Sequence, residues 1–178
     1  MPHYRRYRAA NHPRFITLVT AGRAPRLAAH WPALRRALQG VQDRHPFRID
    51  ALVVLPDHCH LILTLPEGES DCASRINQLK GAFSRQVPDF GAVNPSHQRR
   101  RERGIWQRRY WERILLEEVD YRRHFDYLHY NPVKHGYVAR CRDWPYSTFH
   151  RWVARGVYGR DWGSGGEPQG IGAVVPGE

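Results

Sequence analysis

The chain has 178 residues, with 28 Lys and Arg against 17 Asp and Glu, which gives a formal net charge of +11. This length favours one domain with an ordinary core, and no run of 18 apolar residues is present that could span a membrane. The basic excess, mostly Arg, predicts a polyanionic partner, most often nucleic acid, although a basic surface without a dedicated partner is the alternative.

Apolar residues recur with the period of strands or of helices as far as residue 162. In chain order the predicted elements are a basic arm at 1–13, a strand at 14–20, a helix starting at Pro32, strands at 47–56 and 57–66, a helix at 72–87, a loop at 91–104, a strand at 110–118 and a helix at 119–136. This order predicts an α+β fold, a ferredoxin-like antiparallel sheet with helices on one face, which leaves the other face for a site.

The ends of these segments also carry predictions. A hairpin through Pro56-Asp57 can join the second and third strands. Asn131-Pro132 and Gly136 are expected to end the last helix. Residues 163–178 are rich in glycine, and we expect them to form a disordered tail behind a single domain at residues 1–162.

Cysteine usage bears on the compartment. Three cysteines are present, and no two of them form a C-x-x-C pair. The odd count argues against a disulfide framework or a zinc ribbon. The basic N-terminus has no apolar segment behind it and so does not resemble a secretory signal. We therefore expect a reducing location, in the cytoplasm and associated with the nucleoid.

The third strand opens with two histidines separated by one residue, His58-Cys59-His60. Because side chains alternate along a strand, both histidines share one face with Ile62, and Cys59 points to the other face. Two imidazoles in this arrangement can hold one cation. A structural or surface-exposed pair is nevertheless the commoner reason for this spacing.

The last predicted helix can supply further site residues. Stepping 100° per residue places four residues on one flank: Asp120, His124, Tyr127 and Asn131. The core face is formed by Tyr121, Phe125 and Leu128, and Tyr130 is expected to be exposed on the opposite side. Tyr127 and Asn131 are stacked neighbours, so a nucleophile could lie beside an amide oxygen able to bind metal. A half-buried aromatic at the edge of the core is an equal alternative for Tyr127.

Several motifs together resemble those of the HUH single-tyrosine transposases, most closely the REP-associated tyrosine transposases. These are HYRRYR at 3–8, HCH at 58–60, WQRRYWER at 106–113, YLHYNPVKHG at 127–136 and DWPYSTFHRWVARGVYGRDW at 143–162. The resemblance covers residues 3–162 and implies that His58-Cys59-His60 is the HUH motif. Cys59 stands where a bulky hydrophobic residue is usual, a mild departure because a buried Cys behaves as a small hydrophobe.

The resemblance implies a catalytic tyrosine, Tyr127, and a divalent metal, Mg²⁺ or Mn²⁺, bound by His58, His60 and Asn131. Relatives in the wider group have Gln at the position of Asn131, so an amide oxygen is kept. The metal would polarise a scissile DNA phosphate for attack by the tyrosine, leaving a 5′-phosphotyrosine and a free 3′-hydroxyl. His124 is a weak candidate for a general base, and a structural role is favoured for it.

The resemblance also implies the partner, single-stranded hairpin DNA of the repetitive extragenic palindromic (REP) type. In the family the N-terminal arm reads a tetranucleotide, which here assigns Tyr4, Arg5 and Arg6. A basic stretch is our candidate for gripping the hairpin backbone, with Arg99, Arg100, Arg101, Arg103, Arg108 and Arg109; a solvated basic loop is the alternative. We expect a monomer, without a membrane partner or a small-molecule cofactor.

Two other functions stay open at this point. One is a catalytically inactive protein that binds hairpin DNA or RNA, because ferredoxin-like sheets bind RNA in other families. The other is a metal-dependent phosphodiesterase in which water is the nucleophile. Replacing Tyr127 by Phe distinguishes the transposase from the phosphodiesterase, because only the transposase needs the phenolic oxygen.

Overall fold

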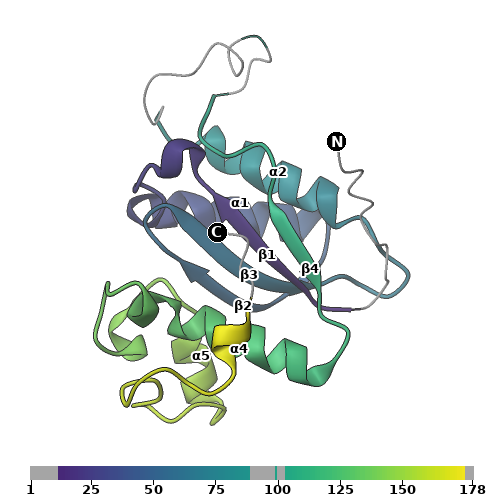
Figure 1. Ribbon diagram of the computed structural model, residues 1–178. Coiled ribbons are helices and arrows are strands. Elements are labelled where there is room, and N and C mark those ends of the chain that lie inside the picture. The colour runs from purple at the N-terminus through teal and green to yellow at the C-terminus, as the bar shows by residue number, and fades with distance from the viewer. Residues whose placement is uncertain (1–11, 89–98, 100–102, 175–178) are drawn as a thin grey trace.

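The computed structural model describes residues 12–88, 99 and 103–174 (Figure 1). Its main elements are β1 (Arg14–Val19), α1 (Trp31–Arg44), β2 (Arg48–Val54), β3 (His58–Thr64), α2 (Cys72–Ser84), β4 (Trp111–Ile114), α4 (Glu118–Lys134) and α5 (Phe149–Ala154). The predicted order of strands and helices is confirmed through α4. The predicted arm and most of the predicted loop at 91–104 lie outside the described residues. Among the described helices, none is long and apolar enough to cross a membrane.

The sheet has four strands in the order β2-β3-β1-β4, and every neighbouring pair is antiparallel. The predicted hairpin between β2 and β3 is confirmed. The strand that carries the two histidines is therefore central, paired with β1 on one side and β2 on the other. In this register Thr17 lies opposite His60, and Val19 lies opposite His58.

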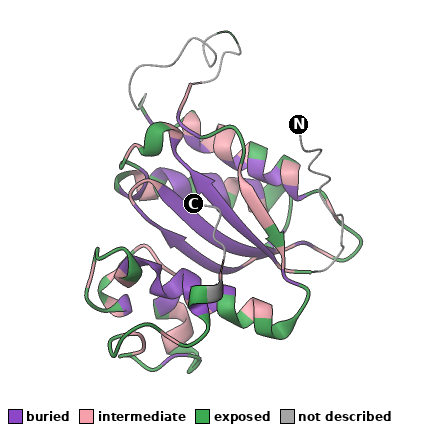
Figure 2. Ribbon diagram, viewed as in Figure 1, coloured by how far each residue is buried: buried purple, intermediate pink, exposed green. Residues whose placement is uncertain are grey.

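Helices cover both faces of the sheet, so the expectation of helices on one face is wrong. One face, with Leu18 and Leu61, packs against α1 and α2. The other face, with Phe15 and Ile62, packs against α4. Figure 1 shows α1 and α2 on one side of the strands and α4 with α5 on the other, and Figure 2 shows the central strands β1 and β3 as almost wholly buried. Apolar residues on both sides of β1 and β3 require such double cover.

The end of α4 differs from the prediction in one respect. Pro132 lies inside the helix, which continues to Lys134. Gly136 then ends it with a φ of 72°, a backbone conformation that glycine adopts without strain. The amide of Gly136 donates to the carbonyl of Val133, and the amide of Tyr137 donates to that of Pro132. These two bonds form a Schellman motif, which satisfies carbonyls that a helix end leaves open.

Tyr130 is buried, with 7% of its surface exposed, which corrects the expectation that it is exposed. Its ring contacts Trp162 at 6.4 Å, and a side chain at Gly163 would collide with it and with Cys141. Segments that follow α4 in the sequence therefore cover this side of the helix. A helical wheel cannot reveal that cover, because it comes from elsewhere in the chain.

Part of the predicted disordered tail packs against the domain. Residues 163–174 are described, and the short 3-10 helix Ile171–Ala173 lies beside α4. Ile171 is 2% exposed within the apolar cluster that α4 shares with the sheet. Residues 175–178 lie outside the described residues.

His129 makes stability depend on pH. Its Nδ1–H donates to the carbonyl of Phe125 at 2.9 Å, and Nε2 lies 2.9 Å from the Thr148 hydroxyl. Burial lowers the pKa of His129 to about 3, so between that pH and the ordinary value near 6.5 the unfolded chain binds a proton that the folded protein does not.

We therefore expect the contribution of His129 to the free energy of unfolding to fall by about 1.4 kcal/mol for each pH unit between 6.5 and about 3. Urea titrations at several pH values, on the wild type and His129→Gln, measure this slope. The non-titrating variant should lose stability more slowly as the pH falls. Equal slopes in the two proteins would contradict the prediction.

Candidate active site

The two histidines lie side by side at the start of β3, both fully buried. Their ring centroids are 4.9 Å apart. Nδ1 of His58 lies 2.6 Å from a carboxylate oxygen of Asp57, and Nδ1 of His60 lies 2.9 Å from the hydroxyl of Thr17. Such partners fix the orientation of an imidazole and its tautomer, as they do for histidines that bind metal through the other nitrogen.

Asp57 is an anion that orients His58. Burial would raise its pKa, but the hydrogen bond and charge of His58 and the Arg23 guanidinium, 3.0 Å from Oδ2, lower the pKa overall. An ionised carboxylate accepts the Nδ1 proton of His58. The lone pair of the neutral imidazole is then on Nε2.

Tyr127 faces this pair from α4. Its side chain is 1% exposed, and its ring lies 5.6 Å from that of His60. Lys134 donates to the phenolic oxygen at 3.1 Å, and its ammonium lies 4.5 Å from the ring centroid. The sequence motifs did not predict a role for Lys134, although a residue two helical turns after Tyr127 lies on nearly the same side of the helix. An ammonium in this place stabilises negative charge on the tyrosine oxygen.

Asn131 occupies the helix face between two contacts with the histidines. One turn before it, Tyr127 contacts His60, and one turn after it, His135 lies 5.5 Å from His58. Asn131 is completely buried, and neither its amide oxygen nor its nitrogen has a hydrogen-bond partner among the described residues. A buried amide of this kind is destabilising unless another group satisfies it.

A metal ion fits this donor set. Two oriented imidazoles and one buried amide oxygen would supply three ligands and leave positions for phosphate oxygens and water. Within the described residues, no three His, Cys, Asp or Glu side chains cluster in a way that could hold a metal. The third ligand of the predicted site is accordingly an amide.

His124 is separated from the two histidines by the ring of Phe15. The Nδ1–H of His124 donates to the backbone carbonyl of Asp120 at 2.8 Å. Burial lowers the pKa of His124, although the Asp120 carboxylate nearby acts to raise it. The Phe15 ring lies between, 4.9 Å from His124 and 5.2 Å from His60. These contacts place His124 in the packing of α4 against the sheet.

The predicted DNA-binding residues are only partly described. Tyr4, Arg5, Arg6, Arg100 and Arg101 lie outside the described residues. Arg99, Arg108 and Arg109 are exposed, as a contact with the phosphates of a DNA backbone requires.

Arg103 is different, because its guanidinium donates to the carbonyls of Ser84 and Val87 at the end of α2. Lys80 on the same helix donates to the carbonyls of Gln107 and Arg108. These bonds anchor the segment that presents Arg108 and Arg109.

Several known proteins are similar to this chain in sequence and in fold. The chain matches the family model of IS200-like transposases over residues 12–129. It is 43% identical to the REP-associated tyrosine transposase of Escherichia coli K12 over 163 residues, which cover 91% of each chain. It is 42% identical over 165 residues to a relative from Haemophilus influenzae, which covers 92% of this chain and 94% of that one.

A solved structure of a REP-associated tyrosine transposase bound to a REP hairpin superposes with a TM-score of 0.82, at 39% identity, covering 100% of this chain and 98% of the other. The chain therefore belongs to the IS200-like transposase family, a class of DNA cleaving and joining enzymes. Within that family it is one of the REP-associated tyrosine transposases. The resemblance predicted from the motifs is confirmed.

Proposed function

We propose that this protein is a metal-dependent single-stranded DNA endonuclease and strand transferase that cleaves and rejoins DNA at REP-like hairpins. The observation that carries the proposal is the buried contact of Tyr127 with His60, beside an Asn131 whose amide has no partner among the described residues. The solved relative bound to a REP hairpin supports the choice of substrate.

In the proposed reaction the oxygen of Tyr127 attacks the scissile phosphorus. The phenol releases its proton to solvent, a bond forms between its oxygen and the phosphorus, and the bond to the 3′-oxygen breaks; the leaving 3′-oxygen takes up a proton from solvent and becomes the free 3′-hydroxyl. The 5′-phosphotyrosine keeps the energy of the phosphodiester, so a 3′-hydroxyl can reverse the step and join strands.

A divalent ion, Mg²⁺ or Mn²⁺, would polarise the scissile phosphate when bound by His58, His60 and Asn131. The imidazoles favour Mn²⁺ over Mg²⁺. Asp57 and Thr17 hold the two imidazoles in place, and Lys134 stabilises the developing phenolate.

The exposed arginines and the N-terminal arm would hold the DNA. Arg108 and Arg109 carry charge to the surface beside α2, where they can contact phosphates, and Arg99 is also exposed. The arm, with Tyr4, Arg5 and Arg6, is proposed to read the tetranucleotide at the foot of the hairpin.

The direct test incubates the protein with an end-labelled hairpin oligonucleotide and Mn²⁺, followed by denaturing gel electrophoresis. We expect a protein–DNA adduct that survives denaturation and a product with a free 3′-hydroxyl. Cleavage without any adduct would contradict the proposal and would indicate that the protein is a phosphodiesterase. Tight binding without cleavage would replace the proposal by an inactive DNA-binding protein.

Lys134 provides a further test of the proposed chemistry. We expect Lys134→Met to slow adduct formation at saturating DNA about 10- to 100-fold, the effect of losing one hydrogen bond from a charged group. Lys134→Arg, which keeps a cationic donor, should recover part of the rate. Single-turnover kinetics measure the rate, and equilibrium binding of the hairpin should change little. A Lys134→Met protein that cleaves at the wild-type rate would exclude a role for Lys134 at the phenolic oxygen.

A further inference from the structure

A row of aromatic rings leads away from the two histidines across the surface. Each ring contacts the next, with centroid separations of 5.5 Å for His58–His135, 6.0 Å for His135–Tyr137, 5.5 Å for Tyr137–Trp144, 5.6 Å for Trp144–Tyr146 and 6.3 Å for Tyr146–Trp31. We call His135, Tyr137, Trp144, Tyr146 and Trp31 the aromatic row. It connects the metal-site end of β3 to the N-terminus of α1.

The aromatic row combines fixed positions with exposed surface. Trp144 donates its indole N–H to the carbonyl of Val54 at 3.0 Å, and the carbonyl of Tyr146 accepts the Val54 amide at 2.8 Å. Tyr137 donates one of the two hydrogen bonds of the Schellman motif that ends α4, and it is 43% exposed. The remaining members are exposed or partly exposed. The row is therefore anchored on the sheet edge while its rings still reach solvent.

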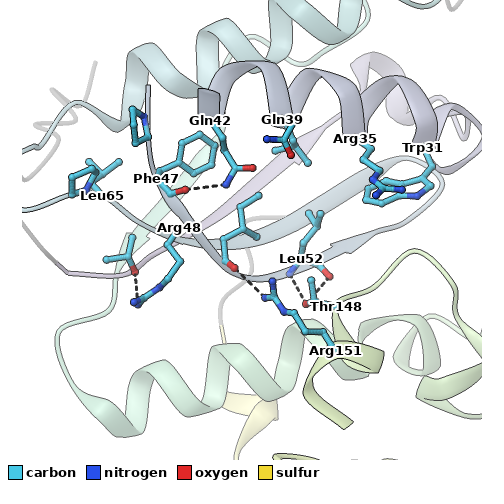
Figure 3. Close-up of a pocket in the computed structure, with 15 residues that line it drawn as sticks. Trp31, Arg35, Gln39, Gln42, Phe47, Arg48, Leu52, Leu65, Thr148 and Arg151 are labelled. Carbon is cyan, nitrogen blue, oxygen red and sulfur yellow. Dashed lines mark hydrogen bonds between the residues drawn. The ribbon is translucent and has the colours of Figure 1, made fainter. Parts of the chain in front are cut away.

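The row ends at a cavity of about 720 Å³ between α1, the edge strand β2 and α5 (Figure 3). Polar and aromatic residues that line it include Trp31, Arg35, Gln39, Arg48, Thr148 and Arg151. Arg151 is held in place because it donates to the carbonyls of Ile49 and Asp50. Arg48 pairs with Asp50, whereas Arg35 is exposed and makes no hydrogen bond or ion pair with any other described residue.

We propose that the aromatic row and this cavity bind single-stranded DNA that continues beyond the cleavage site. Aromatic side chains interleaved with cationic ones are what unpaired strands require, because bases stack on the rings and phosphates contact the arginines. Bases in a duplex already stack on one another and cannot use such rings. The inference rests on the proposed function, since it takes His58 and His60 as the point where the strand is cut.

The positive charge of the cavity favours a polyanion as its ligand. Its lining residues include three arginines and no acidic side chain, and the whole chain carries a net charge of +11. A polyanionic strand arriving from the metal site along the row would meet these arginines at its far end. The aromatic row would thus form a binding path for the unpaired DNA beside the cleavage site, and this path is separate from the exposed Arg99, Arg108 and Arg109.

The test measures binding of three fluorescent hairpins by anisotropy: one without an extension, one with a 5′ extension and one with a 3′ extension of about ten unpaired thymidines. We expect one extension to tighten binding by the wild type. Tyr137→Ala should lose about tenfold of that gain, and Tyr137→Phe, which keeps the ring, should retain it.

Arg35 tests the cavity end of the path. Arg35→Ala should reduce the gain from the extension and lower the slope of log affinity against log salt by about 0.7, the effect of one lost phosphate contact on a single strand. The matched control is Arg36→Ala, because Arg36 is the next residue on α1 and donates instead to Gln86. The control should leave both the gain and the slope unchanged.

The outcomes separate this inference from the proposed catalysis. If neither extension tightens binding, or if the gain survives both Tyr137→Ala and Arg35→Ala, the path is wrong even where covalent adducts form. If the gain depends on Tyr137 and Arg35 but no adduct forms, the path stands and the proposed catalysis fails.

Discussion

Tyr127→Phe should abolish the covalent protein–DNA adduct and lower strand cleavage by about a thousandfold or more, because it removes the attacking oxygen. The substitution keeps the ring, which is buried against Phe15 and His60. The fold should therefore be retained, and hairpin binding should remain close to that of the wild type. Gel analysis after denaturation measures the adduct, and anisotropy measures the binding.

A matched control for this substitution is Tyr130→Phe. Tyr130 is three residues away on α4 and is also buried, but it contacts Trp162 on the side of the helix away from the histidines. This control should leave the adduct unchanged. Retained cleavage in Tyr127→Phe, with free 5′-phosphate ends, would indicate that water is the nucleophile instead.

Asn131→Leu should lower metal-dependent cleavage by about a hundredfold or more, because the site would lose one of the three proposed protein ligands. The same substitution should leave the metal-free protein at least as stable as the wild type. A buried amide without partners among the described residues is replaced by an apolar side chain of similar size, which removes a penalty of about 1–3 kcal/mol. Loss of function would thus accompany unchanged or greater stability.

Thermal unfolding with and without Mn²⁺ separates these two effects. The wild type should be stabilised by the ion, since it binds the folded state alone, and Asn131→Leu should lose most of that stabilisation. Asn131→Asp is the matched control, because it keeps an oxygen ligand at the same place. A strongly destabilised metal-free Asn131→Leu protein would mean that the amide supports the fold and not the ion.

The residues near the histidines were predictable because each depends on a local period. Alternation along β3 places His58 and His60 together, and the helical period of α4 aligns Tyr127 with Asn131. The structure brings these two sets face to face across β3 and α4. Their roles as ligands and nucleophile stay predictions until the experiments above are done.

Other features depend on segments that meet only after folding. The burial of Tyr130 comes from Trp162, and the double cover of the sheet comes from the way α4 returns across it. Lys134 reaches Tyr127 because α4 continues past Pro132, whereas sequence rules expect a helix to end near such a residue. Long-range packing decided the first two points, and the continuation of α4 past Pro132 decided the third.

The central position of β3 gives the two halves of the site unequal stiffness. The backbone that carries His58 and His60 is hydrogen-bonded to a strand on each side. Tyr127 belongs to a helix that meets the sheet through side chains. A displacement of α4 would therefore move Tyr127, the proposed nucleophile, without breaking any β-ladder, while the two histidines would keep their geometry. In amide hydrogen exchange, β3 should be the slow partner and the end of α4 the fast one.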